Sequence, residues 1–355
     1  MNVSDFDYHL PESYIAQEPV EPRDSSRLMV LDRRTGAIEH LIFRDIQRLL
    51  NPGDVLVLND TRVIPARLIG YKLRSGGRVE FLLLRQVDER RWRALVGGRG
   101  LQPGTEIGFD GSHVRAKILE TSDSPERVVE FSHPVTETLA AIGQTPLPPY
   151  IHTHLSNPER YQTVYNRHSG SAAAPTAGLH FTPDLLTALR ERGIVFAYCT
   201  LHIGLDTFQP IRVAEVEQHR IHSESASLKA EDAEIINQAK LRGNRIIAVG
   251  TTSARTLETA AILSAGGQPS NPNQVTEQCP WRAVVAFERD TDLFIYPGYR
   301  WRVVDGLVTN FHLPRSTLLM MVSSFASRES LLHAYEIAKA QGYRFYSFGD
   351  AMFIA

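Results

Sequence analysis

The stretch Thr182–Leu201, TPDLLTALRERGIVFAYCTL, predicts a helix, a glycine turn and a buried strand in succession. Thr182 is a natural N-cap, and Pro183 suits the first helical position because the N–H that it lacks has no intrahelical partner there. Gly193 follows the helix and readily adopts the left-handed conformation that closes it. The same pattern recurs at residues 230–249 and 331–348. This alternation predicts an α/β fold with a mixed, largely parallel sheet flanked by helices.

The pattern of polar and apolar residues is different between residues 62 and 148. Short segments of alternating polar and apolar residues appear there, separated by Gly-Gly, Pro-Gly and Asp-Gly turns. Regularly spaced short strands with such turns are typical of a small β-barrel. We therefore expect a discontinuous α/β catalytic domain, 1–61 and 149–355, with an all-β barrel domain, 62–148, inserted into it.

Composition places the chain among ordinary globular proteins. It has 355 residues, of which 43% are hydrophobic and 22% charged. No apolar run approaches the roughly 20 residues of a membrane span, and the N-terminal stretch lacks the features of a secretion signal. Cys199 and Cys279 lie far apart and form no metal-binding or disulfide pattern. We expect a cytoplasmic protein with no membrane partner.

Charge is distributed unevenly along the chain. The net charge is −2, but residues 61–100 contain ten basic and three acidic residues, a local charge of +7. Such a segment is suited to binding a polyanion such as nucleic acid. The alternative interpretation is an ordinary solvated β-surface.

Five predicted apolar strands end in polar or glycine clusters. In open α/β sheets, ligands bind beyond the carboxyl ends of the strands, so five such endings predict one functional edge. The clusters are Asn59-Asp60-Thr61-Arg62, His202-Ile203-Gly204, Gly250-Thr251-Thr252-Ser253, Asn310-Phe311-His312-Leu313-Pro314 and Gly349-Asp350.

Two loops near these strand ends are candidates for ligand binding. Ser169–Phe181, SGSAAAPTAGLHF, is rich in small residues and nearly uncharged, which favours a ligand-hugging loop with His180 as its polar group. A tight turn packed under the sheet is the alternative. Gly250–Ser253 precedes a predicted helix and offers backbone N–H groups to an anion or a ribose, although simple N-capping by Ser253 also explains it.

Histidine pairs suggest a metal at first sight. His152 and His154 form an HxH pair, and His219 and His222 precede Glu224 with ligand-like spacing. Neither set has partners at a recognised metal-binding spacing, so we expect no metal. A metal-dependent α/β hydrolase using His152 and His154 remains one alternative function, and a non-catalytic RNA-binding protein is another.

Taken together, these clusters resemble the S-adenosylmethionine:tRNA ribosyltransferase-isomerase family of queuosine biosynthesis, nearly end to end. The stretches that carry the resemblance are Phe6–Pro11, Asp54–Arg67, Tyr161–Tyr165, Ala172–Phe181, Thr200–Pro210, His222–Glu224, Ala248–Arg255, Leu293–Gly298, Val308–Thr317 and Phe348–Phe353. The chain departs from the family pattern at Asp206, where a glycine is expected.

The resemblance implies an unusual reaction. S-adenosylmethionine donates its ribosyl group to 7-aminomethyl-7-deazaguanine at the wobble position of tRNA, giving epoxyqueuosine and releasing adenine and methionine. No cofactor is implied, because S-adenosylmethionine is consumed as a substrate. The expected partners are tRNAs with a GUN anticodon (those for Asp, Asn, His and Tyr), and the expected state is a monomer.

The sulfonium acidifies the adjacent 5′ carbon, so a histidine base is a suitable catalyst. The predicted catalytic residues are His180, His202, His312 and Asp350, and we expect at least one of the three histidines to be structural. Arg255 is expected to pair the methionine carboxylate, and Thr251, Thr252 and Ser253 to bind that carboxylate or ribose hydroxyls. The remaining predicted substrate contacts are Asn59, Asp60, Arg62, Thr176, Gly178, Gly250 and Asn310, and the predicted tRNA contacts are Arg74, Arg78, Arg91 and Arg93.

Overall fold

The computed structural model describes residues 1–121, 126–136, 138–153, 155, 157–204, 211, 213–275 and 282–355. The described chain forms two compact units. The larger contains Met1–Thr61, Pro149–His168 and Pro175–Ala355, and the smaller contains Arg62–Pro148 and Ser169–Ala174. The domain boundaries expected from the sequence place residues 169–174 in the larger domain, whereas the structure groups them with the smaller unit.

A nine-stranded mixed sheet forms the centre of the larger unit. Its strands lie in the order β16 (Phe287–Thr291), β14 (Glu224–Leu228), β13 (Val195–Leu201), β3 (Val55–Asn59), β15 (Ile246–Val249), β17 (Gly306–Asn310), β18 (Ala351–Ile354), β1 (Arg27–Leu31) and β2 (Ile38–Ile42). Strands β13, β3, β15 and β17 are mutually parallel. Strand β18 runs antiparallel to β17 and parallel to β1.

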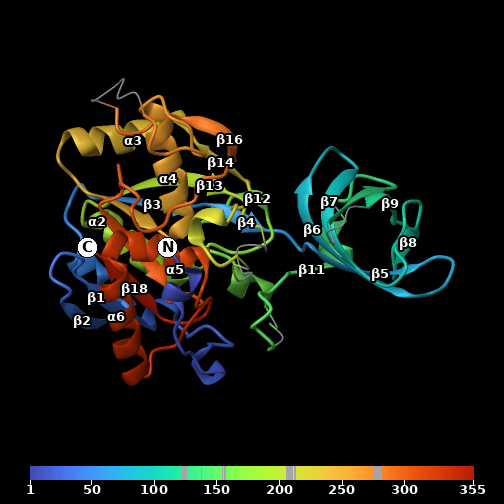
Figure 1. Ribbon diagram of the computed structural model, residues 1–355, viewed down its shortest axis with the longest axis horizontal. Coiled ribbons are helices and arrows are strands. Elements are labelled where there is room, and N and C mark those ends of the chain that lie inside the picture. The colour runs from blue at the N-terminus through green and yellow to red at the C-terminus, as the bar shows by residue number, and fades with distance from the viewer. Residues whose placement is uncertain are drawn as a thin grey trace. The chain divides into compact units, whose positions relative to one another are not determined.

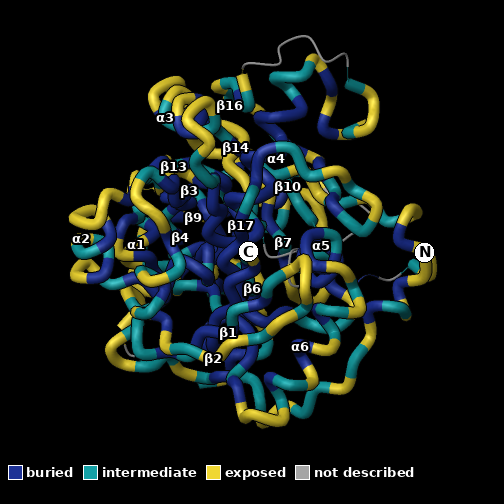
Figure 2. The backbone as a smooth tube through the Cα atoms, turned by 90° about the vertical axis from the view of Figure 1, so that its left-hand side faces the viewer, coloured by how far each residue is buried: buried dark blue, intermediate teal, exposed yellow. Residues whose placement is uncertain are grey.

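Both faces of the sheet are covered, as the apolar strands require. In β3, Val55 and Val57 pack into one core, and Leu56 and Leu58 pack into the other. Alternate side chains of a strand point to opposite faces, so a strand between two layers is apolar throughout. Figure 2 shows the residues of β3 and β17 buried, whereas α2 and α3 contain exposed residues.

Helices form the two covering layers (Figure 1). The first core draws residues from α3 (Ala230–Leu241), α4 (Thr251–Ser264), α5 (Thr317–Ala326) and α6 (Arg328–Ala340). The second draws on α2 (Pro183–Glu191) and two short 3-10 helices, η4 (Phe43–Arg48) and η6 (Thr176–His180). The other 3-10 helices are η1 (Val3–Phe6), η2 (Glu12–Tyr14), η3 (Arg23–Ser25), η5 (Pro158–Tyr161) and η8 (Val216–Gln218).

The smaller unit is a closed antiparallel barrel. Its strands are β5 (Arg67–Lys72), β6 (Arg78–Gln86), β7 (Arg91–Gly97), β10 (Glu126–Phe131), β9 (Arg115–Thr121) and β8 (Glu106–Phe109). Pairing of β5 with β8 closes the barrel at Gly70, where an added Cβ would lie 2.6 Å from Ile107. The predicted fold class, a mixed sheet flanked by helices with an inserted β-barrel, is confirmed.

Short elements complete the two units. In the smaller unit, β11 (Gly143–Gln144) pairs with β5, and α1 (Leu139–Ile142) precedes it. A two-stranded sheet of β4 (Thr61–Val63) and β12 (His168–Ser171) contains two of the four points at which the chain passes from one unit to the other.

Two local predictions are wrong. Residues 345–348 form no strand, because Tyr346 has a φ of 70° and the chain turns there; the strand begins at Ala351. Their apolar character reflects burial of Phe345, Tyr346 and Phe348. The helix after β15 begins at Thr251 rather than Ala254, and Gly250, not Ser253, is its N-cap. Ser253 instead donates to the Val249 carbonyl.

Candidate functional site

Six strand ends of the larger unit lie at one edge of the sheet. β3, β13, β15 and β17 end there, and because β18 is antiparallel to β17, β18 and β1 begin there. Asp350 therefore reaches this edge by preceding a strand, not by following one. With about 4.8 Å between neighbouring strands, the edge from β13 to β18 spans about 19 Å.

Asn59 joins three elements at the middle of this edge. Its Oδ1 accepts from the N–H groups of Leu201 and Thr61, and its Nδ2 donates to the Leu201 carbonyl and to Oγ1 of Thr252. The residue is fully buried. Its amide thus fixes β13 and the start of α4 against β3, and it leaves little hydrogen-bonding capacity for a ligand.

Asp60 and two histidines form the first polar cluster at the edge. Thr200 donates to Oδ1 of Asp60 at 2.7 Å, and Nε2 of His168 lies 3.6 Å from Oδ2. Nδ1 of His202 lies 2.8 Å from Oγ1 of Thr61. Burial and the neighbouring His168 lower the pKa of His202, and Asp60 partly opposes this. His202 is only partly buried, and its Nε2 has no hydrogen bond within the described chain.

His180 forms the second cluster, on the η6 helix. Its Nδ1 lies 2.7 Å from Oγ of Ser26, and its Nε2 lies 3.3 Å from Nδ2 of Asn310. The ring stacks on Phe43, with 4.9 Å between centroids. Burial lowers the pKa of His180 to about 4, with Arg344 and Arg23 acting in the same direction and Asp350 against it. His180 is therefore neutral at neutral pH.

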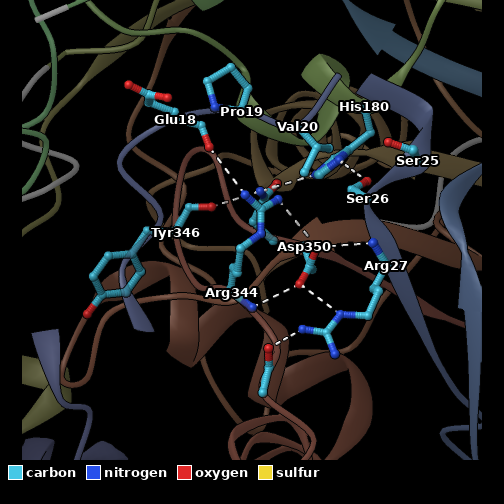
Figure 3. A network of polar contacts seen from close by, with 12 residues as sticks. Glu18, Pro19, Val20, Ser25, Ser26, Arg27, His180, Arg344, Tyr346 and Asp350 are labelled. Atoms are coloured by element: carbon cyan, nitrogen blue, oxygen red, sulfur yellow. Dashed lines mark hydrogen bonds and ion pairs between the residues drawn. The ribbon is translucent and has the colours of Figure 1, made fainter. Parts of the chain in front are cut away.

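Asp350 lies beside this cluster and is bound by two arginines (Figure 3). Its Oδ1 accepts from the N–H of Arg27 at 3.0 Å, and its Oδ2 accepts from the N–H of Arg344 at 2.8 Å. The guanidinium groups of Arg27 and Arg344 lie 3.4 and 3.6 Å from the carboxylate. Asp350 is 2% exposed, so its charge is held inside a network of fixed donors.

His312 belongs to a different environment. Its Nε2 lies 2.7 Å from Oγ1 of Thr309, whereas His180 binds the next residue, Asn310. Neighbouring side chains of a strand point to opposite faces, so these two histidines are attached to opposite faces of β17. The His312 N–H donates to the hydroxyl of Tyr335, and burial lowers the pKa of His312 to about 3. Its described contacts are those of a structural histidine.

Arg255 is occupied by the protein itself. It pairs with Glu224 and donates to the carbonyls of His222, Thr291 and Leu293. Burial lowers its pKa, and Glu224 opposes this. The guanidinium thus ties α4 to β14 and β16, and Glu224 holds the place that the sequence prediction gave to a substrate carboxylate.

The small residues of the Ser169–Phe181 loop have packing partners. An added Cβ at Gly178 would lie 2.0 Å from the hydroxyl of Tyr165, so this close approach requires glycine. Ala177 lies next to Gly250, with 3.6 Å between its Cβ and a Cβ placed on the glycine. Thr176 begins η6 and is partly buried, and Thr251 is 8% exposed at the first position of α4.

The remaining predicted contacts lie in the smaller unit. Arg62 is partly buried at its start. Arg74 and Arg78 are exposed, and neither has an ion pair within the described chain. Arg91 pairs with Asp88 at 2.5 Å, and Arg93 with Glu126 at 2.9 Å. The structure thus divides the four predicted tRNA contacts into two unpaired and two paired arginines.

Metal and membrane features can be judged only over the described part of the chain. There, no group of three or more His, Cys, Asp or Glu residues is placed to hold a metal ion. None of the described helices has the length and apolar character needed to cross a membrane. His154, Asp206 and Cys279 lie outside the described residues, so the HxH pair and the departure at Asp206 are not described.

Sequence reasoning missed several members of the two clusters. Ser26 and Arg27 stand in a polar segment that precedes an apolar strand, where nothing indicates contact with residues 180 and 350. His168 begins the short strand β12, next to the Ser169–Phe181 stretch that was expected to be a loop, and Arg344 was assigned to a strand. The sequence feature that could have indicated a role for Ser26 and Arg27 is the density of polar residues at Glu21–Arg27.

Comparison with known proteins identifies the family. Residues 3–354 match the family described as "Queuosine biosynthesis protein". The chain belongs to this family. Proteins named S-adenosylmethionine:tRNA ribosyltransferase-isomerase from two strain designations of Clostridium kluyveri are 51% identical to it over the full length of both chains. A crystal structure of S-adenosylmethionine tRNA ribosyltransferase from Thermotoga maritima is 39% identical, with a TM-score of 0.55 over 99% of this chain and 100% of that one.

The depressed histidine pKa values predict acid sensitivity. In the unfolded chain a histidine binds its proton near pH 6.5, whereas folded His180 and His312 bind theirs only near pH 4 and pH 3. Between these values the unfolded state holds more protons, so the free energy of unfolding falls as pH falls. We expect a loss of about 2 kcal/mol per histidine at pH 5 relative to pH 7.5.

Urea denaturation of wild type and His312→Gln at both pH values measures this loss. The variant should lose about 2 kcal/mol less than wild type on acidification. His333→Gln, which changes an exposed histidine of α6, is the control and should behave as wild type. An unchanged pH dependence in His312→Gln would contradict the assignment.

Proposed function

We propose that this protein is an S-adenosylmethionine:tRNA ribosyltransferase-isomerase. The observation that carries the proposal is the 51% identity, over the whole of both chains, with relatives of that name. The proposed reaction transfers and isomerises the ribosyl group of S-adenosylmethionine onto 7-aminomethyl-7-deazaguanine at the tRNA wobble position. Epoxyqueuosine forms, and adenine and methionine leave. We further propose that the substrates are tRNAs with GUN anticodons, that no additional cofactor takes part, and that the protein is a cytoplasmic monomer.

The arrangement of the sheet edge supports a reaction with two large reactants. The Asp60–His202 cluster lies at the ends of β3 and β13, and the His180–Asp350 cluster lies at the end of β17 and the start of β18. The strands that carry the two clusters are therefore about 10 to 19 Å apart, with Gly250 at the end of β15 between them. That span suits an adenosyl group and a nucleobase side by side better than a single small substrate.

Among the three histidines, we propose His202 as the base that removes the 5′ proton next to the sulfonium. Thr61 holds its Nδ1, its Nε2 has no hydrogen bond within the described chain, and its ring is partly exposed. Its lowered pKa keeps it neutral, and so able to accept a proton, at neutral pH. His180 and His312 are more deeply buried than His202, and both ring nitrogens of His180 are engaged by the protein.

The proposed activity can be tested in one incubation. Purified protein, S-adenosylmethionine and tRNA carrying the aminomethyl deazaguanine should yield epoxyqueuosine, detected by mass spectrometry of the nucleosides, with adenine and methionine in equal amounts. The same tRNA with guanine at the wobble position is the control. Absence of the modified nucleoside together with stoichiometric bound zinc would instead favour a metal-dependent hydrolase.

Replacing the proposed base should abolish most turnover. We expect His202→Gln to lower kcat for adenine release by about 10²- to 10⁴-fold, the usual contribution of a positioned general base. His333→Gln is the matched histidine control. A near-wild-type rate in His202→Gln would exclude His202 as the base, and the same assay on His180 and His312 variants would then identify whether either replaces it.

The unpaired barrel arginines should dominate tRNA binding. Arg74 and Arg78 offer uncompensated charge to phosphates, whereas Arg91 and Arg93 are each neutralised by a carboxylate. We expect Arg74→Glu/Arg78→Glu to weaken tRNA binding at about 0.1 M salt by about tenfold or more and to lower the salt dependence of the affinity. Arg91→Glu/Arg93→Glu makes the same change in charge and should have a smaller effect. Equal effects, or none, would contradict this assignment.

A further inference from the structure

The side chain of Asn310, at the end of β17, is held by two acceptors. Its Nδ2 donates to the carbonyl of Tyr346 at 3.0 Å and lies 3.3 Å from Nε2 of His180. Asn310 is 2% exposed. Both amide hydrogens are therefore directed at groups of the protein.

These contacts fix the orientation of the amide. A backbone carbonyl can only accept, so the atom facing Tyr346 must be the NH2 group rather than the oxygen. The same NH2 group faces Nε2 of His180, which therefore accepts and carries no proton. The proton of the neutral ring is then on Nδ1 and is donated to Oγ of Ser26, 2.7 Å away. Figure 3 shows His180 beside Ser26.

The outcome is an amide oxygen without a partner. Oδ1 of Asn310 is buried and has no hydrogen bond within the described chain. Buried polar atoms of native proteins nearly always have a partner, so an orphaned acceptor calls for an explanation. The backbone beside this oxygen is also strained. The carbonyl of Tyr346 accepts from the Asn310 amide, and Tyr346 has a φ of 70°, a left-handed conformation that a bulky residue rarely adopts. Strained residues of this kind cluster at ligand clamps.

We propose that Oδ1 of Asn310 accepts a hydrogen bond from a donor group of a nucleoside substrate, and that His180 and Ser26 are positioning residues that hold the amide in that orientation. The identity of the nucleoside rests on the proposed function: the donor belongs either to the adenosyl group of S-adenosylmethionine or to the modified base of the tRNA. Because the oxygen is buried, side chains that cover it move when the donor binds.

Two substitutions of His180 separate a positioning role from a catalytic one. His180→Ala removes the acceptor that holds the Asn310 amide, and we expect the dissociation constant of one substrate to rise about tenfold or more. Glutamine places a side-chain oxygen near the position of Nε2 but cannot act as a base, so His180→Gln should recover most of the lost affinity. A kcat more than 100-fold below wild type in His180→Gln, with dissociation constants unchanged, would overturn the proposal and make His180 a base.

Ser26→Ala tests the other end of the chain of hydrogen bonds. Without the Ser26 acceptor the His180 proton is free to move to Nε2, where it faces the NH2 of Asn310, and binding should weaken. Ser25→Ala is the matched control, because Ser25 donates to the Pro22 carbonyl and not to His180. Calorimetry with S-adenosylmethionine alone and with tRNA carrying the aminomethyl base identifies the source of the donor. Wild-type affinity of Ser26→Ala for both would overturn the proposal.

The tautomer itself can be measured without any substrate. Long-range 1H–15N correlation spectra of histidine-labelled protein, with the His180 signal assigned from His180→Gln, should show a proton on Nδ1 and a bare Nε2 at pH 7. A proton on Nε2 would overturn the proposed orientation of Asn310. This result is independent of the transferase assay, so a protein without transferase activity would refute the proposed function while leaving the orientation of the amide to be decided by the spectrum.

Discussion

The buried side chain of Asn59 is the constraint on which the functional edge depends. Parallel strands bring their carboxyl ends to one edge, but they do not determine how the loops beyond those ends are arranged. The Asn59 amide does so, because it binds both backbone groups of Leu201, the N–H of Thr61 and the hydroxyl of Thr252. Since a buried amide with any of these bonds missing is costly, the end of β13 and the start of α4 are held in one arrangement relative to β3. His202 follows Leu201 directly in the chain, so the hydrogen bonds of Asn59 also fix the position of His202.

Much of this architecture follows from sequence pattern. Continuous apolar strands such as Val55–Leu58 can be stable only between two layers, and Gly193 and Gly243, each following a helix, mark where β13 and β15 begin. The edge was predicted from strands that end in polar residues, and that reasoning holds for Asn59, His202, Gly250 and Asn310. Asp350 was predicted at the same edge because residues 345–348 were expected to form a strand, and they do not. It lies there because β18 runs against β17, and strand direction is set by long-range pairing that a local pattern does not contain.

The partners of individual side chains could not be predicted for the same reason. Arg255 suits a substrate carboxylate by chemistry, but Glu224, contributed by a neighbouring strand, fills that role. Gly178 suggests close approach of a ligand, but the hydroxyl of Tyr165 occupies the space. In both cases the residue type was interpreted correctly as a cation needing an anion, or as a place where no side chain fits. The identity of the neighbour depended on the fold.

The buried Asp350 carboxylate limits how this edge of the sheet can act on a substrate. A carboxylate removed from water is stable only if fixed donors replace its hydration, and here two backbone N–H groups and two guanidinium groups do so. A substrate amine that approached Asp350 would compete with donors that also hold the starts of β1 and β18 together. The carboxylate is therefore better suited to fixing Arg27 and Arg344 than to binding a ligand directly. The neutral groups beside it, His180 and Asn310, carry no such structural charge, so the polar chemistry available to a substrate at this end of the edge comes from them.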